Sequence, residues 1–211
     1  AGAAARTMVT TAIAAATAAI TTVSLGKALT GVIDIGLANN GVLAGLVSIT
    51  APCSTCTGEG AFIIGIIGGL VYYGASKMLH KFKIDDVVDA VPVHMFCGMW
   101  GVIAAGLFAS EENYASAYYG DRAADCCGAF YGCGGAAFGA NLGFVFAVIA
   151  WVIGTSLLLF FGIKFTVGIR VSIEVEEAGM DSSKHGGQTY PEQAKGKDSN
   201  ATMVKPAVDS A

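Results

Sequence analysis

The chain has 211 residues, of which 54% are hydrophobic and 13% charged, and its formal net charge is −4. Soluble domains carry roughly 25% charged residues, so this composition excludes an ordinary soluble domain and favours a protein embedded in a lipid bilayer. The charge balance offers no basic face for nucleic acid, which excludes a nucleic-acid-binding function.

Long uncharged stretches predict five membrane helices. A spanning α-helix needs about 20 mostly apolar residues, and charged residues are absent from 7–26, 35–58, 60–76, 90–110 and 126–163. We therefore expect an all-α, polytopic transmembrane bundle over 1–166, with helices at about 3–25, 38–52, 58–79, 88–109 and 140–166. The second is short and contains glycine, so it is a candidate for a tilted or partial span. A soluble protein could bury one such helix, but the few polar residues of this chain cannot cover five.

The positions of lysine and arginine predict the orientation of these helices. Basic residues in short loops mark the cytoplasmic side of a membrane. Here they follow the first, third and fifth predicted helices, whereas the intervening loops are acidic. This pattern places the start of the chain and residues 53–57 and 110–139 outside, and residues 26–37, 77–87 and 167–211 in the cytoplasm.

Five of the six cysteines fall on the predicted outer side, at Cys53, Cys56, Cys126, Cys127 and Cys133, and Cys97 lies inside a helix. Disulfides persist outside cells, so some outer pairing is expected, but its connectivity cannot be deduced from sequence. The Cys-x-x-Cys pair resembles a redox or zinc motif, yet no second pair with zinc spacing follows it. We therefore expect no metal site.

The stretch Gly132–Ala137 matches the G-x-G-x-x-A pattern of dinucleotide-binding loops. Such a loop needs a preceding strand and an acidic residue about 20 positions later, and neither is present. We interpret the glycines as an outer loop and expect no cofactor. No nucleophile–base pair can be placed on one side of the membrane either, which argues against an enzyme.

The segment from 167 onward is rich in Glu, Lys, Ser, Gly and Asp. It cannot bury enough apolar surface to fold alone, so we expect an irregular cytoplasmic tail that orders by docking. The chain starts at Ala1 without a signal-peptide pattern. We therefore expect a fragment of a longer protein.

The most informative stretch is Ile84–Gly101. Asp85 and Asp86 stand at the predicted cytoplasmic start of a helix, where carboxylates are favoured by the helix dipole and by free N–H groups, and capping alone can explain both. Asp89 lies deeper, and Pro92 suits a first helical turn.

His94 follows Asp89 by five residues, which is roughly 7.5 Å further along a helix. An ionisable side chain at that depth is costly and usually faces a bundle interior or a pathway. The alternative is a neutral histidine that is satisfied by one hydrogen bond between packed helices. Gly98, Gly101 and Ala105 are small residues that suit either tight packing or an open lumen.

The segment Asp85–His94, followed by Cys97–Gly101, closely resembles the tenth helix of the ammonium transporter family (the Amt/Mep/Rh superfamily), with its D-D-x-x-D-x-x-x-V-H and C-G-x-W-G patterns. Further similar segments lie in order along residues 1 to about 190 and correspond to the seventh, eighth and eleventh helices of the plant-type branch and to the family's tail; they are Arg6–Thr11, Asn40–Val47, Thr166–Val171 and Gly179–Gly187.

This resemblance implies the C-terminal half of an eleven-helix subunit of a homotrimer in which each subunit has its own narrow pore. His94 matches the second of two pore histidines, and the first belongs to a helix outside this chain. Ala90 matches a pore-lining apolar position, and Asp89 matches a structural carboxylate at the inner pore mouth, near Asp85 and Asp86. Met95 and Phe96 stand where smaller residues are common, so the pore near His94 could be narrower.

The resemblance also implies the activity: transport of ammonium, with ammonia passing an apolar pore lined by histidine. The tail would contact the neighbouring subunit, and Ser183 occupies the place of a phosphorylatable residue. The expected partners are ammonium or ammonia, membrane lipids and further copies of the subunit, and the expected location is the plasma membrane with a cytoplasmic C-terminus. A related channel for neutral gases and an ammonium sensor are the alternatives.

Overall fold

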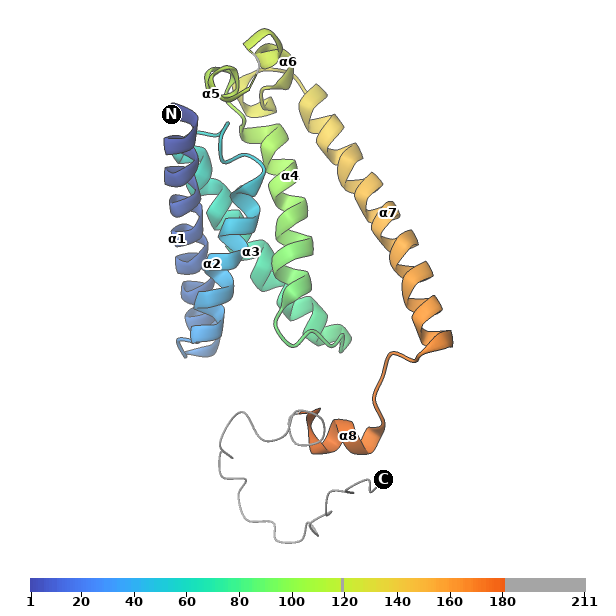
Figure 1. Ribbon diagram of the computed structural model, residues 1–211. Coiled ribbons are helices and arrows are strands. Elements are labelled where there is room, and N and C mark those ends of the chain that lie inside the picture. The colour runs from blue at the N-terminus through green and yellow to red at the C-terminus, as the bar shows by residue number, and fades with distance from the viewer. Residues whose placement is uncertain (119, 181–211) are drawn as a thin grey trace. The chain divides into compact units, whose positions relative to one another are not determined.

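The computed structural model describes residues 1–118 and 120–180, and in these ranges the secondary structure is helical throughout, which confirms the all-α prediction (Figure 1). The long helices are α1 (Gly2–Thr30), α2 (Ile35–Thr50), α3 (Gly58–Phe82), α4 (Cys97–Phe108) and α7 (Ala136–Thr166). The short elements are η1 (Val91–Phe96), α5 (Glu111–Ala117), η2 (Gly120–Arg122), α6 (Ala123–Cys126), η3 (Ala129–Tyr131) and α8 (Ile173–Ala178). The described residues fall into two units that divide after Gly154.

Four helical segments are long and apolar enough to cross a membrane: Gly2–Thr30, Gly58–Phe82, Val91–Phe108 and Ala136–Thr166. The remaining predicted helix, at about 38–52, corresponds to α2, which has 16 residues. At 1.5 Å per residue it is about 24 Å long, whereas the hydrocarbon core of a bilayer is about 30 Å thick. The expectation that this helix is short agrees with the structure, and the other four are long enough for a full span.

Helices α1, α2 and α3 pack through small residues. The buried face of α1 repeats every fourth residue and consists of Thr10, Ala14, Ala18, Thr22 and Gly26. A Cβ atom at Gly45 of α2 would overlap the backbone of Ala14, and a Cβ at Gly69 of α3 would come within 2.9 Å of the carbonyl oxygen of Ala18. Small residues let helix backbones approach closely, which is how membrane helices associate without a hydrophobic driving force between them.

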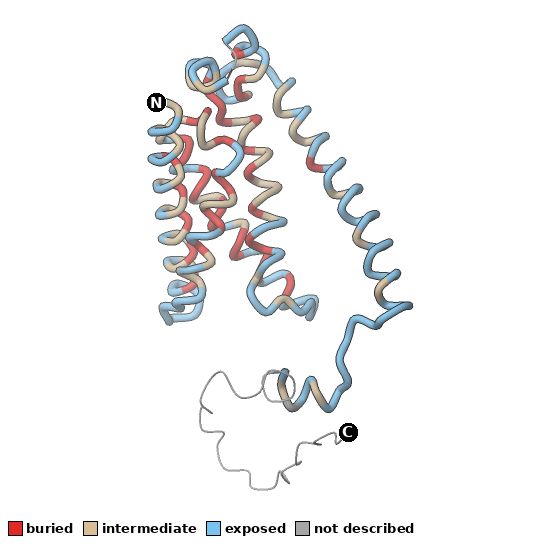
Figure 2. The backbone as a smooth tube through the Cα atoms, in the orientation of Figure 1, coloured by how far each residue is buried: buried red, intermediate tan, exposed pale blue. Residues whose placement is uncertain are grey.

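Polar side chains on these helices bond to neighbouring backbones. The Thr10 hydroxyl donates to the Cys53 carbonyl (2.7 Å), and the Thr22 hydroxyl donates to the Leu37 carbonyl (3.0 Å). From α4, the Trp100 indole N–H donates to the Ile64 carbonyl on α3 (3.1 Å). Figure 2 shows the buried residues concentrated where α1 to α4 face one another. The core of the first unit is therefore this four-helix bundle.

The predicted fourth span begins as a π-helical turn, η1, that continues directly into α4. Pro92 lies in its first turn, as expected from its missing N–H group. On α4, a Cβ at Gly101 would come within 2.7 Å of the Ser48 carbonyl oxygen, so this glycine serves helix packing. Single π turns are rare and frequently mark functional sites.

The segment between α4 and α7 folds over the predicted outer end of the bundle as a cap of short helices. Arg6 on α1 holds it: its guanidinium donates to the Ser54 carbonyl (2.8 Å), the Asn113 carbonyl (3.2 Å) and the Ser116 hydroxyl (2.9 Å). The Phe130 ring meets the Phe108 ring edge-on, with centroids 5.0 Å apart. The cap is thus bonded to α1 and packed against α4.

The second unit contains the end of α7 and the short helix α8. The Arg170 guanidinium forms a two-point pair with the Glu176 carboxylate, with bonds of 2.9 and 3.0 Å. The tail was predicted to be irregular, and α8 shows that its first part includes one short helix. Ser183 lies outside the described residues.

Candidate functional site

His94 lines an apolar groove between η1–α4 and α7. The groove encloses about 400 Å³, and its walls are His94, Met95, Gly98, Met99 and Val102 on one side and Phe144, Val145, Val148, Ile149, Val152 and Ile153 on the other. His94 is the one ionisable side chain in this set. A histidine therefore faces an otherwise apolar cavity, and Gly98 leaves room beside it.

His94 lies within the π turn η1. Its neighbours Pro92 and Val93 are buried against the bundle, whereas His94 is exposed. The imidazole forms no hydrogen bond to the described part of the chain. The alternative expectation, a histidine satisfied by a hydrogen bond between packed helices, finds no bonding partner within residues 1–118 and 120–180.

Asp89 connects the start of η1 to α3. Its carboxylate accepts a hydrogen bond from the Tyr72 hydroxyl (2.8 Å) and from the Ser76 hydroxyl (3.1 Å to each oxygen). The backbone of Asp89 has φ 57°, in the left-handed region that Asp and Asn enter more readily than bulky residues. The carboxylate thus ties the turn that leads to His94 to helix α3.

Asp86 caps the helix that carries His94. Its two carboxylate oxygens accept from the backbone N–H groups of Ala90 (2.8 Å) and Val91 (2.7 Å), which lack partners in the helix. Asp85 is exposed and forms no side-chain bond within residues 1–118 and 120–180. The capping explanation therefore applies to Asp86 alone. Ala90 is exposed but does not line the groove, and its role as a pore-lining residue stays a prediction.

Sequence reasoning did not identify the α7 wall of the groove. Phe144, Val148 and Ile149 oppose His94 from a helix that is apolar on all sides. A helix without an amphipathic pattern gives no signal for the face that meets a site. Tyr72 and Ser76, the partners of Asp89, were also missed because their link to it is tertiary.

The five cysteines on the predicted outer side differ in their bonding. Cys127 and Cys133 are joined in a disulfide, which agrees with the expected outer pairing, and Cys53, Cys56 and Cys126 are free thiols. Burial, with Cys53 nearby, raises the pKa of the Cys56 thiol to about 12, so Cys56 is not a ready nucleophile near neutral pH. The Glu111 carboxylate lies within 4.8 Å of the Cys127 and Cys133 sulfurs, but disulfide sulfurs are not thiolate ligands.

Comparisons with known proteins agree on one family. A sequence profile described as "Ammonium Transporter Family" matches residues 1–190. Ammonium transporter 1 member 1 of Arabidopsis thaliana is 40% identical over 185 residues, and ammonium transporter Amt2 of Archaeoglobus fulgidus is 39% identical over 186 residues. These alignments cover 88% and 85% of this chain, but the chain spans 37% of the length of either relative.

Solved structures show the same fold. The crystal structure of Saccharomyces cerevisiae Mep2 aligns with a TM-score of 0.74 at 23% identity, covering 82% of this chain and 38% of that protein. A structure titled "Sensor Amt Protein" also gives a TM-score of 0.74, at 25% identity, covering 87% of this chain and 42% of the other. The helical fold of this chain is therefore one that known structures share.

Proposed function

This chain belongs to the ammonium transporter family, and from that premise we propose that it forms one wall of a pore that moves ammonium nitrogen across a membrane as ammonia. The observation that supports this proposal is the position of His94, which is exposed, has no side-chain hydrogen bond within the described residues and lies in a groove that is otherwise apolar. The four long apolar helices make the chain a multi-pass membrane protein.

The groove favours the neutral form of the substrate. A full charge at the centre of a bilayer costs at least ~2.5–3.5 kcal/mol, and the apolar walls around His94 offer ammonium no carboxylate to offset that cost. A neutral imidazole can donate to or accept from a passing ammonia molecule, depending on its tautomer. Ammonium thus gives its proton to water at the mouth of the pore before it enters the apolar section, and His94 hydrogen-bonds the ammonia inside.

The remaining wall of the pore comes from a segment other than the described helices. The chain spans 37% of the length of its plant relative, and His94 is exposed. We place the protein in the plasma membrane as a homotrimer, with membrane lipids around the exposed apolar side chains of α7 and with the C-terminal tail in the cytoplasm. The tail contacts the neighbouring subunit, where phosphorylation of Ser183 would add about −1.5 to −2 charges and disturb docking.

A chimera tests the role of His94. The 211-residue chain is joined behind the part of the Arabidopsis relative that precedes the matched region, and uptake of ¹⁵N-ammonium is measured in cells without their own ammonium transporters. We expect uptake by the chimera, none by the chain alone, and a loss of roughly tenfold or more in His94→Ala, as for the loss of one ~1.4 kcal/mol interaction.

The matched control is His80→Ala, which removes a histidine that lies outside the groove, and it should leave uptake unchanged. Equal uptake by His94→Ala and the parent chimera would contradict the pore assignment. A chimera that binds ammonium without uptake would favour a sensor, and one that passes carbon dioxide but not ammonia would favour a gas channel.

The same chimera tests the tail. Ser183→Asp should lower uptake by disturbing docking, whereas Ser182→Asp, with the same charge one position away, should lower it less. Equal uptake in both variants would exclude Ser183 as a switch.

A further inference from the structure

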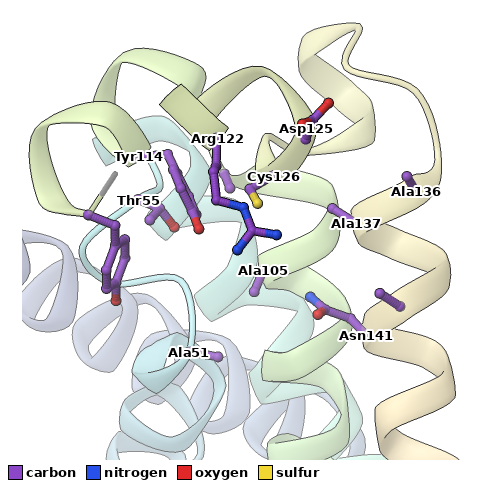
Figure 3. A pocket seen from close by; sticks show the side chains of 13 residues that line it. Ala51, Thr55, Ala105, Tyr114, Arg122, Asp125, Cys126, Ala136, Ala137 and Asn141 are labelled. Carbon is purple, nitrogen blue, oxygen red and sulfur yellow. The ribbon is translucent and has the colours of Figure 1, made fainter. Parts of the chain in front are cut away.

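A second cavity, of about 510 Å³, lies at the predicted outer end of α4 and α7, beneath the cap (Figure 3). Its roof carries the polar residues Tyr114, Tyr118, Arg122, Asp125 and Cys126. Its apolar floor is formed by the methyl groups of Ala105, Ala109, Ala137 and Ala140. The cavity is distinct from the His94 groove, since the two share no lining residue.

The exposed side chain of Arg122 lines the cavity, and its N–H donors have no partner among the described residues. Of the three arginines in the sequence, Arg6 donates to three oxygens of the protein, and Arg170 forms a two-point pair with a carboxylate. Arg122 forms no hydrogen bond or ion pair with any residue in the described ranges. A guanidinium has five N–H donors in a planar fork that matches a carboxylate at two points.

Nearby acidic residues do not satisfy Arg122. Asp121 and Asp125 are close in sequence, but neither forms an ion pair with it. Figure 3 shows the Arg122 side chain descending into the cavity between Tyr114 and Asn141, whereas the Asp125 side chain points away from the guanidinium. The local fold therefore directs this positive charge toward the cavity.

A second donor is available in the same cavity. The Tyr118 hydroxyl accepts a hydrogen bond from the Ser54 hydroxyl (3.1 Å), so its own hydrogen can be donated to a ligand. The Asn141 amide donates to the Val102 carbonyl (2.9 Å), which orients this side chain at the edge of the floor. Most of the polar lining residues thus come from the cap, and most of the alanines come from α4 and α7.

We propose that this cavity binds a small aliphatic monocarboxylate. The carboxylate accepts hydrogen bonds from Arg122 and Tyr118, and the aliphatic chain lies against the alanine floor. The cap also contains Glu111, Asp121 and Asp125, whose negative charges repel a dianion such as phosphate more strongly than a monoanion. This proposal does not depend on the transport function.

Ligand-observed NMR tests the proposal with the full chain in detergent micelles and butyrate as the probe. We expect saturable binding of butyrate, at least roughly fivefold weaker binding to Arg122→Gln, and intermediate binding to Arg122→Lys, which keeps the charge but not the fork. Arg170→Gln is the matched control, because it removes an arginine charge that does not line the cavity, and it should bind like the parent chain.

A further variant fills the floor and leaves the arginine in place. Ala140→Leu, at an exposed helical position, should weaken butyrate binding even if Arg122→Gln disturbs the cap. Butanol, which lacks the charge, should not compete. Equal butyrate binding by the parent, Arg122→Gln and Ala140→Leu chains would overturn the proposal, as would displacement of butyrate by phosphatidylglycerol at equal concentration, which would assign the site to a lipid phosphate.

Discussion

The two faces of the segment η1–α4 differ in how they use small residues. On one face, Gly101 brings the helix against the backbone of Ser48, and Val93 and Cys97 are buried in the bundle. On the other face, Gly98 and His94 border an open apolar groove. Glycine thus gives close packing on one face and free space on the other. The packed face contributes to the stability of the protein, and the open face borders the candidate site.

The stability of the bundle should be most sensitive to substitution of glycines that contact the backbone of a neighbouring helix. Gly45→Leu should destabilise the protein by about 3 kcal/mol or more, because the added side chain would overlap the backbone of Ala14, which cannot move aside as a side chain can. Thermal unfolding in detergent measures this change. Gly143→Leu on α7 is the matched control, since nothing lies within 4 Å of its added Cβ atom. Equal melting temperatures would show that α1 and α2 are not held in close backbone contact.

Substitution of Asp89, which connects the start of η1 to α3, should cause the second-largest loss of stability. Asp89→Asn keeps a residue type that tolerates positive φ but weakens the bonds from Tyr72 and Ser76, so we expect a loss of about 1–3 kcal/mol. Asp85→Asn should change stability by no more than ~0.5 kcal/mol, because this exposed carboxylate has no bond in the described chain. The same unfolding assay separates the two, and a larger effect at Asp85 would contradict the assigned roles.

Removing the hydrogen bond between α4 and α3 should cause a smaller loss of stability. Trp100→Phe removes the indole N–H that donates to the Ile64 carbonyl but keeps an aromatic ring, so the expected loss is about 1 kcal/mol. Phe146→Leu on α7 provides the comparison for an exposed aromatic ring outside the bundle. Equal losses of stability in the two variants would show that the Trp100 hydrogen bond does not stabilise the bundle.

His94 should matter least for stability and most for transport. Its side chain is exposed and unbonded in the described chain, so His94→Ala should change unfolding by no more than ~0.5 kcal/mol. The same variant in the chimera should lose uptake. A stability loss as large as that of Asp89→Asn would indicate that His94 is a packing residue.

Much of this architecture could be predicted from single positions and their spacing. The uncharged stretches mark the helices, and α2 is indeed the short one, because hydropathy and length are local properties. The ends differ by a few residues: α1 continues to Thr30, closed by the left-handed Gly31, and α7 begins at Ala136 rather than near 140. The D-D-x-x-D-x-x-x-V-H segment points to His94 through residue order alone, because an ionisable residue within an apolar span is unusual.

The sequence by itself determined the helical class, the approximate spans and the family, and it singled out His94 as the candidate pore residue. Only the tertiary structure decided that Gly101 packs whereas Gly98 borders space, that Tyr72 and Ser76 hold Asp89, and that Arg122 points into a cavity without a bonding partner among the described residues. The physical reason is that composition and periodicity act along the chain, whereas a contact between residues on different helices depends on how those helices pack against each other.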